Sequence, residues 1–410
     1  MKAEEVHKCA KCGLCQTKCP VYREVLNESE GPRAKVQLIK HYAEHDLASS
    51  KNLNRIVAKC LMCGNCTAHC PSGLRHDALF MRMRSQMIDD FGEHWQMRFV
   101  YHLLTHGAQL NLATKIARWG HSVALRNLAR EIKIGTIPLK RLPAFNRQPF
   151  RNQVEAVIHP KSASRGKVLY FTGCGTNYVY EDIGSAVVHV LNRLGFEVEI
   201  PQDQVCCGLP MFFHGNLKKA RANILENIGI FDRPDIKAVV VDCATCGAAL
   251  RKEWIHVLEE MDSNTANAQR LSKKVQDITE FVFGYFDLLA PLLDQDQPTS
   301  TVTYHSPCHL RNDQGIQSQI EALLDSIPTI IYKRSADFDT CCGGGGTFFM
   351  DFPEISKRIV EKKIKNAKAT GADILATGCP GCRLNLAGNL TESDPMRVLH
   401  PIQLISNMLP

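Results

Sequence analysis

The chain has 410 residues, of which 44% are hydrophobic and 22% charged, and its formal net charge is +7. This length predicts two to four domains, and this composition is typical of folded proteins and excludes a disordered chain. No apolar run reaches the roughly 18 residues of a membrane-spanning helix, and the charged start MKAEEVHK lacks the apolar core of a secretory signal, so we expect a cytoplasmic protein.

Eighteen cysteines are the unusual feature of the composition. In a reducing compartment, cysteines are more often metal ligands or redox groups than structural disulfides. The first eight form two runs with the spacing C-x2-C-x2-C-x3-C-P, and the second run repeats the first after 51 residues. The runs are Cys9, Cys12, Cys15 and Cys19 before Pro20, and Cys60, Cys63, Cys66 and Cys70 before Pro71.

This spacing is typical of ferredoxins with two [4Fe–4S] clusters, in which the fourth cysteine of each run binds the other cluster. One predicted ligand set is Cys9, Cys12, Cys15 and Cys70, and the other is Cys60, Cys63, Cys66 and Cys19. Zinc is the alternative, because CxxC pairs often bind it. Zinc sites, however, usually use two pairs of ligands and not two triplets, each with a distal Cys-Pro.

Helices are expected around the second run. Residues 33–59 carry apolar side chains at mixed helical spacing, and residues 77–90 place Leu79, Phe80, Met83 and Met87 on one side.

Residues 91–150 form a basic segment with nine Lys or Arg, only Glu93 and Glu131 as acids, and interleaved Trp and Leu. The pattern predicts one or two amphipathic helices. A basic amphipathic helix can lie on an anionic membrane or dock a partner subunit, and the alternative is a linker with a solvated basic face. Nucleic acid is not an expected partner, since no recognition module accompanies the charge.

From residue 167 the pattern alternates between strands and helices. Strands are expected at 167–171, 196–200 and 238–241, with helices at 182–194 and 216–228. A second round has strands at 301–304 and 373–376 and a helix at 353–369. This alternation predicts parallel sheets, and the remaining cysteines follow strands, where open α/β sheets place their ligands.

Those ten cysteines form two sets of five with matched spacing. They are Cys174, Cys206, Cys207, Cys243 and Cys246, and then Cys308, Cys341, Cys342, Cys379 and Cys382. Glycine follows both adjacent pairs, at Gly208 and Gly343, which permits unusual backbone dihedrals and close approach to a cluster. Each CxxC pair could also be a thioredoxin-like redox pair, but that does not account for the adjacent cysteines. His305 and His309 flank Cys308, and we expect them to be hydrogen-bonding neighbours more often than ligands.

The five-cysteine repeats resemble the CCG domains of heterodisulfide reductase catalytic subunits. The whole chain is similar to the iron–sulfur subunits of glycolate oxidase and D-lactate dehydrogenase complexes. The resemblance covers nearly all residues, including Gly31-Pro32-Arg33 before a helix and Ser72-Gly73 after the second run. It implies two [4Fe–4S] clusters in the ferredoxin part and a noncubane iron–sulfur cluster in each five-cysteine set, with one thiolate of the adjacent pair bridging irons. Subunits of the glycolate oxidase type often have an incomplete set, whereas both sets are complete here.

Two functions follow from the resemblance. The first is an electron-transfer subunit without catalytic residues of its own, which relays electrons from an FAD-containing 2-hydroxy-acid dehydrogenase to a quinone or cytochrome acceptor at the inner face of the membrane. The flavin would lie on a partner chain, because no dinucleotide fingerprint is present. The alternative is a thiol/disulfide oxidoreductase with catalytic clusters and a substrate pocket between them. A metal-storage protein does not fit the ordered spacing.

The predicted fold class is α+β multidomain, with a helical ferredoxin-like domain followed by two α/β, Rossmann-like CCG repeats. The expected domains are 1–92 (ferredoxin), 93–166 (basic helical linker), 167–295 (first CCG) and 296–410 (second CCG).

Overall fold

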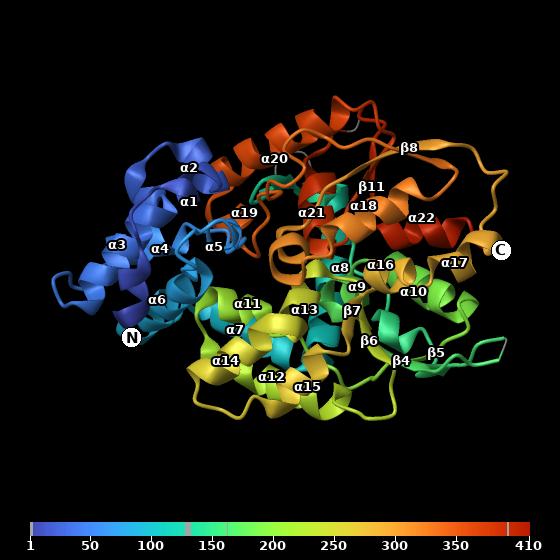
Figure 1. The fold of residues 1–410 in the computed structure, drawn as a ribbon, viewed down its shortest axis with the longest axis horizontal. Coiled ribbons are helices and arrows are strands. Elements are labelled where there is room, and N and C mark those ends of the chain that lie inside the picture. Colours follow the sequence, from blue (N-terminus) through green and yellow to red (C-terminus); the bar gives the residue numbers. More distant parts are fainter. Residues whose placement is uncertain (1–2, 128–132, 162, 392) are drawn as a thin grey trace.

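The computed structural model describes residues 3–127, 133–161, 163–391 and 393–410. Helices of the N-terminal part, blue in Figure 1, lie beside two units that combine helices and strands. The first unit is green and yellow, and the second is orange and red. The predicted mixture of a helical start and two α/β units is therefore confirmed.

The N-terminal part consists of short helices between cysteine-bearing loops. Its elements are η1 (Ala3–Lys8), α1 (Leu14–Thr17), α2 (Pro20–Val25), η2 (Glu28–Glu30), α3 (Pro32–Ala43), α4 (Lys51–Ala58), α5 (Asn65–Ala68) and α6 (His76–Phe91). The predicted helical stretch 33–59 is two helices, α3 and α4. They are separate because Ser50 starts α4 anew, its hydroxyl accepting the Leu53 N–H at 3.1 Å.

The basic segment forms α7 (Trp95–Thr105) and α8 (Gly107–Asn127), as its amphipathic pattern predicts. Leu128, Arg130 and Glu131 of this segment lie outside the described residues. The elements that follow are β1 (Lys133–Ile134), β2 (Ile137–Pro138), η3 (Leu139–Arg141), η4 (Phe150–Asn152) and β3 (Val157–Ile158). Strand β3 pairs antiparallel with β5 of the first α/β unit, so part of the predicted linker belongs to that sheet.

The first α/β unit has a sheet of order β3-β5-β4-β6-β7, parallel except for β3. Its strands are β4 (Lys167–Phe171), β5 (Glu197–Glu199), β6 (Ala238–Val241) and β7 (Val275–Asp277). Its helical elements are α9 (Gly173–Tyr178), α10 (Glu181–Arg193), α11 (Leu209–His214), α12 (Leu217–Phe231), α13 (Ala244–Ala248), the π-helix η5 (Ala249–Glu253), α14 (Trp254–Glu260), α15 (Ala266–Ser272), α16 (Ile278–Phe283), α17 (Phe286–Leu289) and η6 (Ala290–Leu292).

The second unit repeats this plan with a fully parallel sheet of order β11-β10-β8-β9. Its strands are β8 (Ser300–Tyr304), β9 (Ile330–Tyr332), β10 (Ile374–Ala376) and β11 (Arg397–Leu399). Its helical elements are the π-helix η7 (Leu310–Gln314), α18 (Gln317–Asp325), α19 (Phe348–Asp351), α20 (Pro353–Lys368), α21 (Pro380–Asn389) and α22 (Pro401–Asn407). When β3 is left out, both sheets have the same strand order: the second strand along the chain lies at one edge, followed by the first, the third and the fourth.

Strand β4 shows how the parts are joined. Val168 and Tyr170 face a core shared with the second unit, in which α10 packs on α22. Leu169 and Phe171 face a core shared with the N-terminal helices. Because alternate strand residues point to opposite sheet faces, the first sheet is buried on both sides and holds the three parts together.

Within the described residues, no helix combines the length and apolar character needed to cross a bilayer. The Rossmann-like classification of the two units and the domain boundaries after residues 92, 166 and 295 stay predictions.

Candidate metal centres

The two cysteine runs adopt the same backbone conformation. Lys11 and Met62, which are equivalent in the two runs, both have positive φ (56° and 51°), and so do Gly13 and Gly64. A positive φ in a residue with a side chain is uncommon and costs energy. Its recurrence at equivalent positions shows that each run wraps a loop of defined shape.

The first four-cysteine site brings together Cys9, Cys12, Cys15 and Cys70. Burial raises the pKa of the Cys15 thiol to about 11, and the neighbouring Cys9, Cys12 and Cys70 add to that rise. Cys12 is exposed, whereas the other seventeen cysteines are buried or half-buried. This site therefore lies at the surface.

The second four-cysteine site brings together Cys19, Cys60, Cys63 and Cys66, which line one pocket. Burial raises the pKa of Cys66 well above its usual value, and Cys60, Cys63 and Cys19 raise it further. A buried cavity with four converging thiols matches the donor set of a [4Fe–4S] cluster.

The ten remaining cysteines form two matched sites at the carboxyl ends of the parallel strands. In each site, hydrogen bonds join five thiols in the same order. The first five-cysteine site runs Cys174, Cys206, Cys207, Cys246, Cys243. The second runs Cys308, Cys341, Cys342, Cys382, Cys379. Gly208 and Gly343, after the adjacent pairs, both have φ +83°, a region that favours glycine.

Three thiols in these sites are favoured as thiolates. Hydrogen bonds from Cys206 and Cys246 hold the pKa of Cys207 well below its usual value. Cys308 and Cys342 do the same for Cys341. Hydrogen bonds from Cys243 and Cys382 likewise hold the pKa of Cys379 well below its usual value. Since the thiolate is the form that binds metal, each site contains a thiol prepared for ligation.

The two five-cysteine sites touch each other. The Cys243 thiol of the first is hydrogen-bonded to Cys379 of the second. Thr245 Oγ1 lies 3.6 Å from Cys379 Sγ, and the Ala244 N–H donates to the Gly378 carbonyl at 3.0 Å. The ten thiols therefore form one continuous line across the boundary between the units.

The second four-cysteine site is joined to the second five-cysteine site. Cys63 lies in one apolar cluster with Cys308 and Cys341, and the neighbouring Cys341 raises the pKa of Cys63. Asn312 of η7 donates to the Cys63 carbonyl at 2.7 Å. A Cβ at Gly345 would lie 2.5 Å from the Leu61 side chain, so this close approach requires glycine.

His309 lies where the three parts meet. Its Nε2 is 3.2 Å from the Met62 carbonyl oxygen, and its Nδ1 is 3.9 Å from Cys308 Sγ and 3.5 Å from Thr245 Oγ1. Its ring stacks on Phe213 at a centroid distance of 5.2 Å. These contacts fix the ferredoxin loop against both α/β units.

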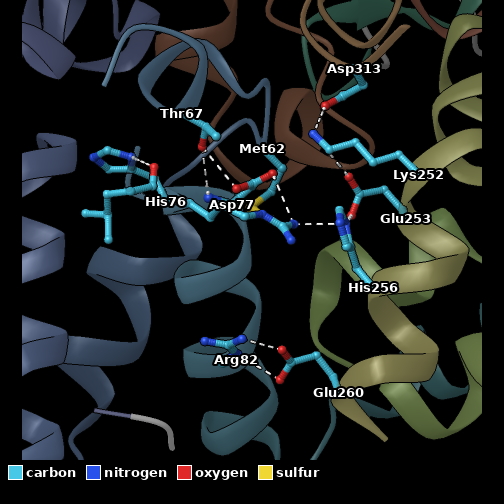
Figure 2. Close-up of polar contacts among 12 residues, drawn as sticks. Met62, Thr67, His76, Asp77, Arg82, Lys252, Glu253, His256, Glu260 and Asp313 are labelled. Carbon is cyan, nitrogen blue, oxygen red and sulfur yellow. Dashed lines mark hydrogen bonds and ion pairs between the residues drawn. The ribbon is translucent and has the colours of Figure 1, made fainter. Parts of the chain in front are cut away.

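A charged network fastens α6 to the α/β units (Figure 2). Arg82 pairs with Glu260, and Arg75 lies 2.9 Å from His256 Nδ1. Lys252 donates to Asp313 of the second unit at 2.7 Å. Contacts among all three parts thus hold the second four-cysteine site beside the second five-cysteine site.

Two buried lysines lie close to the cysteines, and their burial bears on whether an anionic cluster fits these sites. Lys35 and Lys363 are each 2% exposed, yet both donate to backbone carbonyls, those of Lys59 and Asp337. Burial lowers the pKa of Lys35, while nearby Cys60 and Cys19 oppose the shift. Burial likewise lowers the pKa of Lys363 to about 8, and Cys342 opposes it. Burying a cation is costly without a counter-charge, and cluster-ligating thiolates supply that charge, so the residues fit an iron–sulfur cluster.

Sequence reasoning found the eighteen cysteines and missed these cations. Lys35 falls in an ordinary helical stretch after the Gly-Pro-Arg segment, and Lys363 belongs to the basic run of α20. Neither has a spacing relative to a cysteine that would mark it.

Comparison with protein families agrees with this organisation. A 4Fe-4S dicluster domain matches residues 5–74, and a cysteine-rich domain, CCG, matches twice, at residues 168–251 and 302–387.

Three curated proteins illustrate the similarity. The probable glycolate oxidase iron-sulfur subunit of Bacillus subtilis is 26% identical, with 99% of this chain and 94% of that protein covered. Lactate utilization protein A of Bacillus cytotoxicus is 30% identical over 59% of this chain and 99% of its own length. A subunit of the dihydromethanophenazine:CoB–CoM heterodisulfide reductase of Methanosarcina mazei is 25% identical over 99% of this chain and 94% of its own.

Proposed function

Because this chain belongs to the family of iron–sulfur oxidoreductase subunits that includes lactate utilization protein A and the glycolate oxidase iron-sulfur subunit, we propose that it relays electrons for a 2-hydroxy-acid dehydrogenase complex. Its donor is a partner chain that carries FAD, and its acceptor is a quinone or cytochrome at the membrane. When bound, the clusters supply sites for one-electron transfer, and this chain's residues position them and tune their potentials.

One observation carries the proposal: the second four-cysteine site and the two five-cysteine sites adjoin one another in a series. The first four-cysteine site reaches the surface at Cys12. The second adjoins the second five-cysteine site through Cys63 and Cys341, which in turn touches the first five-cysteine site through Cys379 and Cys243. Such a series provides a route for electrons from the ferredoxin part into the α/β units.

In this proposal all eighteen cysteines are ligands. The two four-cysteine sites hold [4Fe–4S] clusters, and the two five-cysteine sites hold noncubane clusters. If each site carries four irons, the anaerobically purified chain contains about 16 iron atoms.

Cys207→Ala is expected to remove the cluster of the first five-cysteine site alone. Cys207 accepts hydrogen bonds from two other thiols of that site, so its loss breaks the middle of the ligand set. Iron should fall from about 16 to about 12 atoms per chain. The electron paramagnetic resonance (EPR) signals of the four-cysteine sites should stay unchanged, and their joint loss would refute separate sites.

The donor is tested by anaerobic purification of the tagged chain from its native host. We expect a flavoprotein to co-purify, and glycolate or lactate to bleach the cluster absorbance of the complex. Co-purification of a cytochrome b or a thiol donor without a flavoprotein would contradict the relay of hydroxy-acid electrons.

The acceptor end of the proposal is supported by the surface of α7 and α8. Trp95 and Phe99 on α7 are 70% and 58% exposed, and α8 exposes Leu112, Ile116 and Trp119 at i, i+4 and i+7 spacing. Exposed Arg98, Lys115 and Arg118 accompany them. Aromatic and apolar side chains beside basic ones suit an anionic membrane surface. A pocket lined by Leu104 and Leu110 also reaches Cys174 and Cys206.

The double variant Phe99→Ser/Ile116→Ser is expected to bind anionic lipid vesicles at least about tenfold more weakly, because burial of each such side chain contributes about 1.5–3 kcal/mol. Raised salt should weaken binding of the unmodified chain, since it screens the basic residues. Leu26→Ser, a change at a 76% exposed residue of the N-terminal part, is the control that should bind normally. If the double variant binds the vesicles as strongly as the unmodified chain, α7 and α8 form a linker and not a membrane-binding surface.

A second candidate is a disulfide reductase with catalytic clusters. It is favoured by the two complete five-cysteine sets lying in contact at Cys243 and Cys379, and by the full-length similarity to the heterodisulfide reductase protein of Methanosarcina mazei. Reduction of a substrate disulfide by the purified chain, with no flavoprotein partner, would establish it.

A further inference from the structure

His305 is a buried residue that the proposed relay does not use. It follows strand β8, is 0% exposed, and lies next to the second five-cysteine site. One of its ring nitrogens and the Sγ atoms of Cys342 and Cys382 all lie within 4.8 Å of one another. Within the described residues, neither ring nitrogen has a hydrogen-bond partner.

An unpartnered buried imidazole is energetically costly. An imidazole carries at least one N–H in every protonation state that proteins adopt near neutral pH. The sulfurs of Cys342 and Cys382 lie close to the ring and can accept this hydrogen. Orientation toward these sulfurs therefore gives the ring the partner that its surroundings otherwise lack.

The first unit has no histidine at the equivalent position. Cys174 and Cys308 are equivalent and 134 residues apart, so His305 corresponds to Phe171. Phe171 is 0% exposed and lies in one core cluster with Cys206, Cys207 and Cys246. The same five-cysteine set thus occurs once beside an aromatic hydrocarbon and once beside an N–H donor.

We propose that His305 is a positioning residue that donates a hydrogen bond to the ligand sulfurs of Cys342 or Cys382 and gives the second five-cysteine site a higher reduction potential than the first. The physical reason is that one-electron reduction adds negative charge to a cluster and its sulfurs. An N–H donor stabilises that added charge, and hydrogen bonds to ligand sulfur are a recognised control of cluster potential.

The difference in reduction potential between the two five-cysteine sites affects where an electron rests in the relay. The second five-cysteine site lies between the second four-cysteine site and the first five-cysteine site. With the higher potential of the two, it holds the electron that arrives from the ferredoxin part. This inference rests on the proposed ligand set.

The test compares His305→Leu with His305→Gln, two changes of similar size, of which only the second keeps an N–H donor. The full-length chain is purified anaerobically, its iron is counted, and its EPR signals are followed in a redox titration. In the Leu variant, one five-cysteine signal should become about tenfold harder to reduce, which is about 59 mV for one electron. The Gln variant should stay close to the unmodified chain, and the other signals should not move in either variant.

An unchanged midpoint in the Leu variant, with iron retained, overturns the proposal. Loss of about four irons in both variants also overturns it, because His305 would then be a ligand. If the Leu variant fails to fold, His305→Phe, which carries the residue of the first unit, replaces it. An unmodified chain with only about eight irons would refute the proposed ligand set itself, and the inference with it.

Discussion

If the proposed partner delivers electrons to the exposed first four-cysteine site, the double variant Cys60→Ala/Cys66→Ala is expected to stop electron flow from that site to both five-cysteine sites. Only Cys19 and Cys63 of the second four-cysteine site would remain, too few to hold a cube that needs four thiolates. Iron should fall from about 16 to about 12 atoms per chain. Because electron tunnelling decays steeply with distance, the loss of this one intermediate should reduce substrate-driven reduction of the five-cysteine clusters to the background rate.

The measurement is rapid-freeze EPR of the complex after addition of the hydroxy acid. Direct reduction by dithionite is the control, since it should still reduce the five-cysteine clusters and so show that they are assembled. Reduction by the partner at the unmodified rate would mean that electrons enter at the α/β units, and the proposed order of sites would be wrong.

The repeated cysteine runs and the elements with a clear hydrophobic pattern could be predicted from the sequence. The two cysteine runs repeat after 51 residues, and Lys11 and Met62, at equivalent positions, share a positive φ. The strand at 167–171 and the helix at 353–369 were predicted within one residue of β4 and α20, because each is a continuous apolar or amphipathic stretch with clear ends.

The contacts between repeats could not be predicted in the same way. Cys63 approaches Cys341 across 278 positions of the chain, and Cys243 meets Cys379 because the two sheets face each other with their carboxyl ends. Neither contact follows from local periodicity, since both depend on how three separate cores pack. The short strands β3 and β9 were missed for a related reason: two or three residues carry too little pattern, and pairing with a neighbour defines them.

Arg84→Leu is expected to destabilise the chain strongly. The Arg84 guanidinium on α6 donates to the carbonyl of Phe213 in the first α/β unit, to those of Val57 and Ala58 at the end of α4, and to that of Cys60, the first cysteine of the second run. Leucine leaves all four acceptors without this donor. Since hydrogen bonds to charged groups contribute about 1.5–3 kcal/mol each, we expect the free energy of unfolding to fall by about 3 kcal/mol.

The decrease should appear as a lower urea midpoint of the anaerobically purified chain and as faster proteolytic release of the N-terminal part, because the lost contacts join that part to the first unit. Arg55→Leu is the matched control: Arg55 is exposed on the neighbouring helix α4, and such surface changes usually stay within about 0.5 kcal/mol. Arg84→Lys keeps the charge but not the planar fork of donors, so its midpoint should lie between the two. Equal midpoints for the Arg84 and Arg55 leucine variants would show that water replaces the guanidinium at these carbonyls, and that the apolar cores alone hold the ferredoxin part in place.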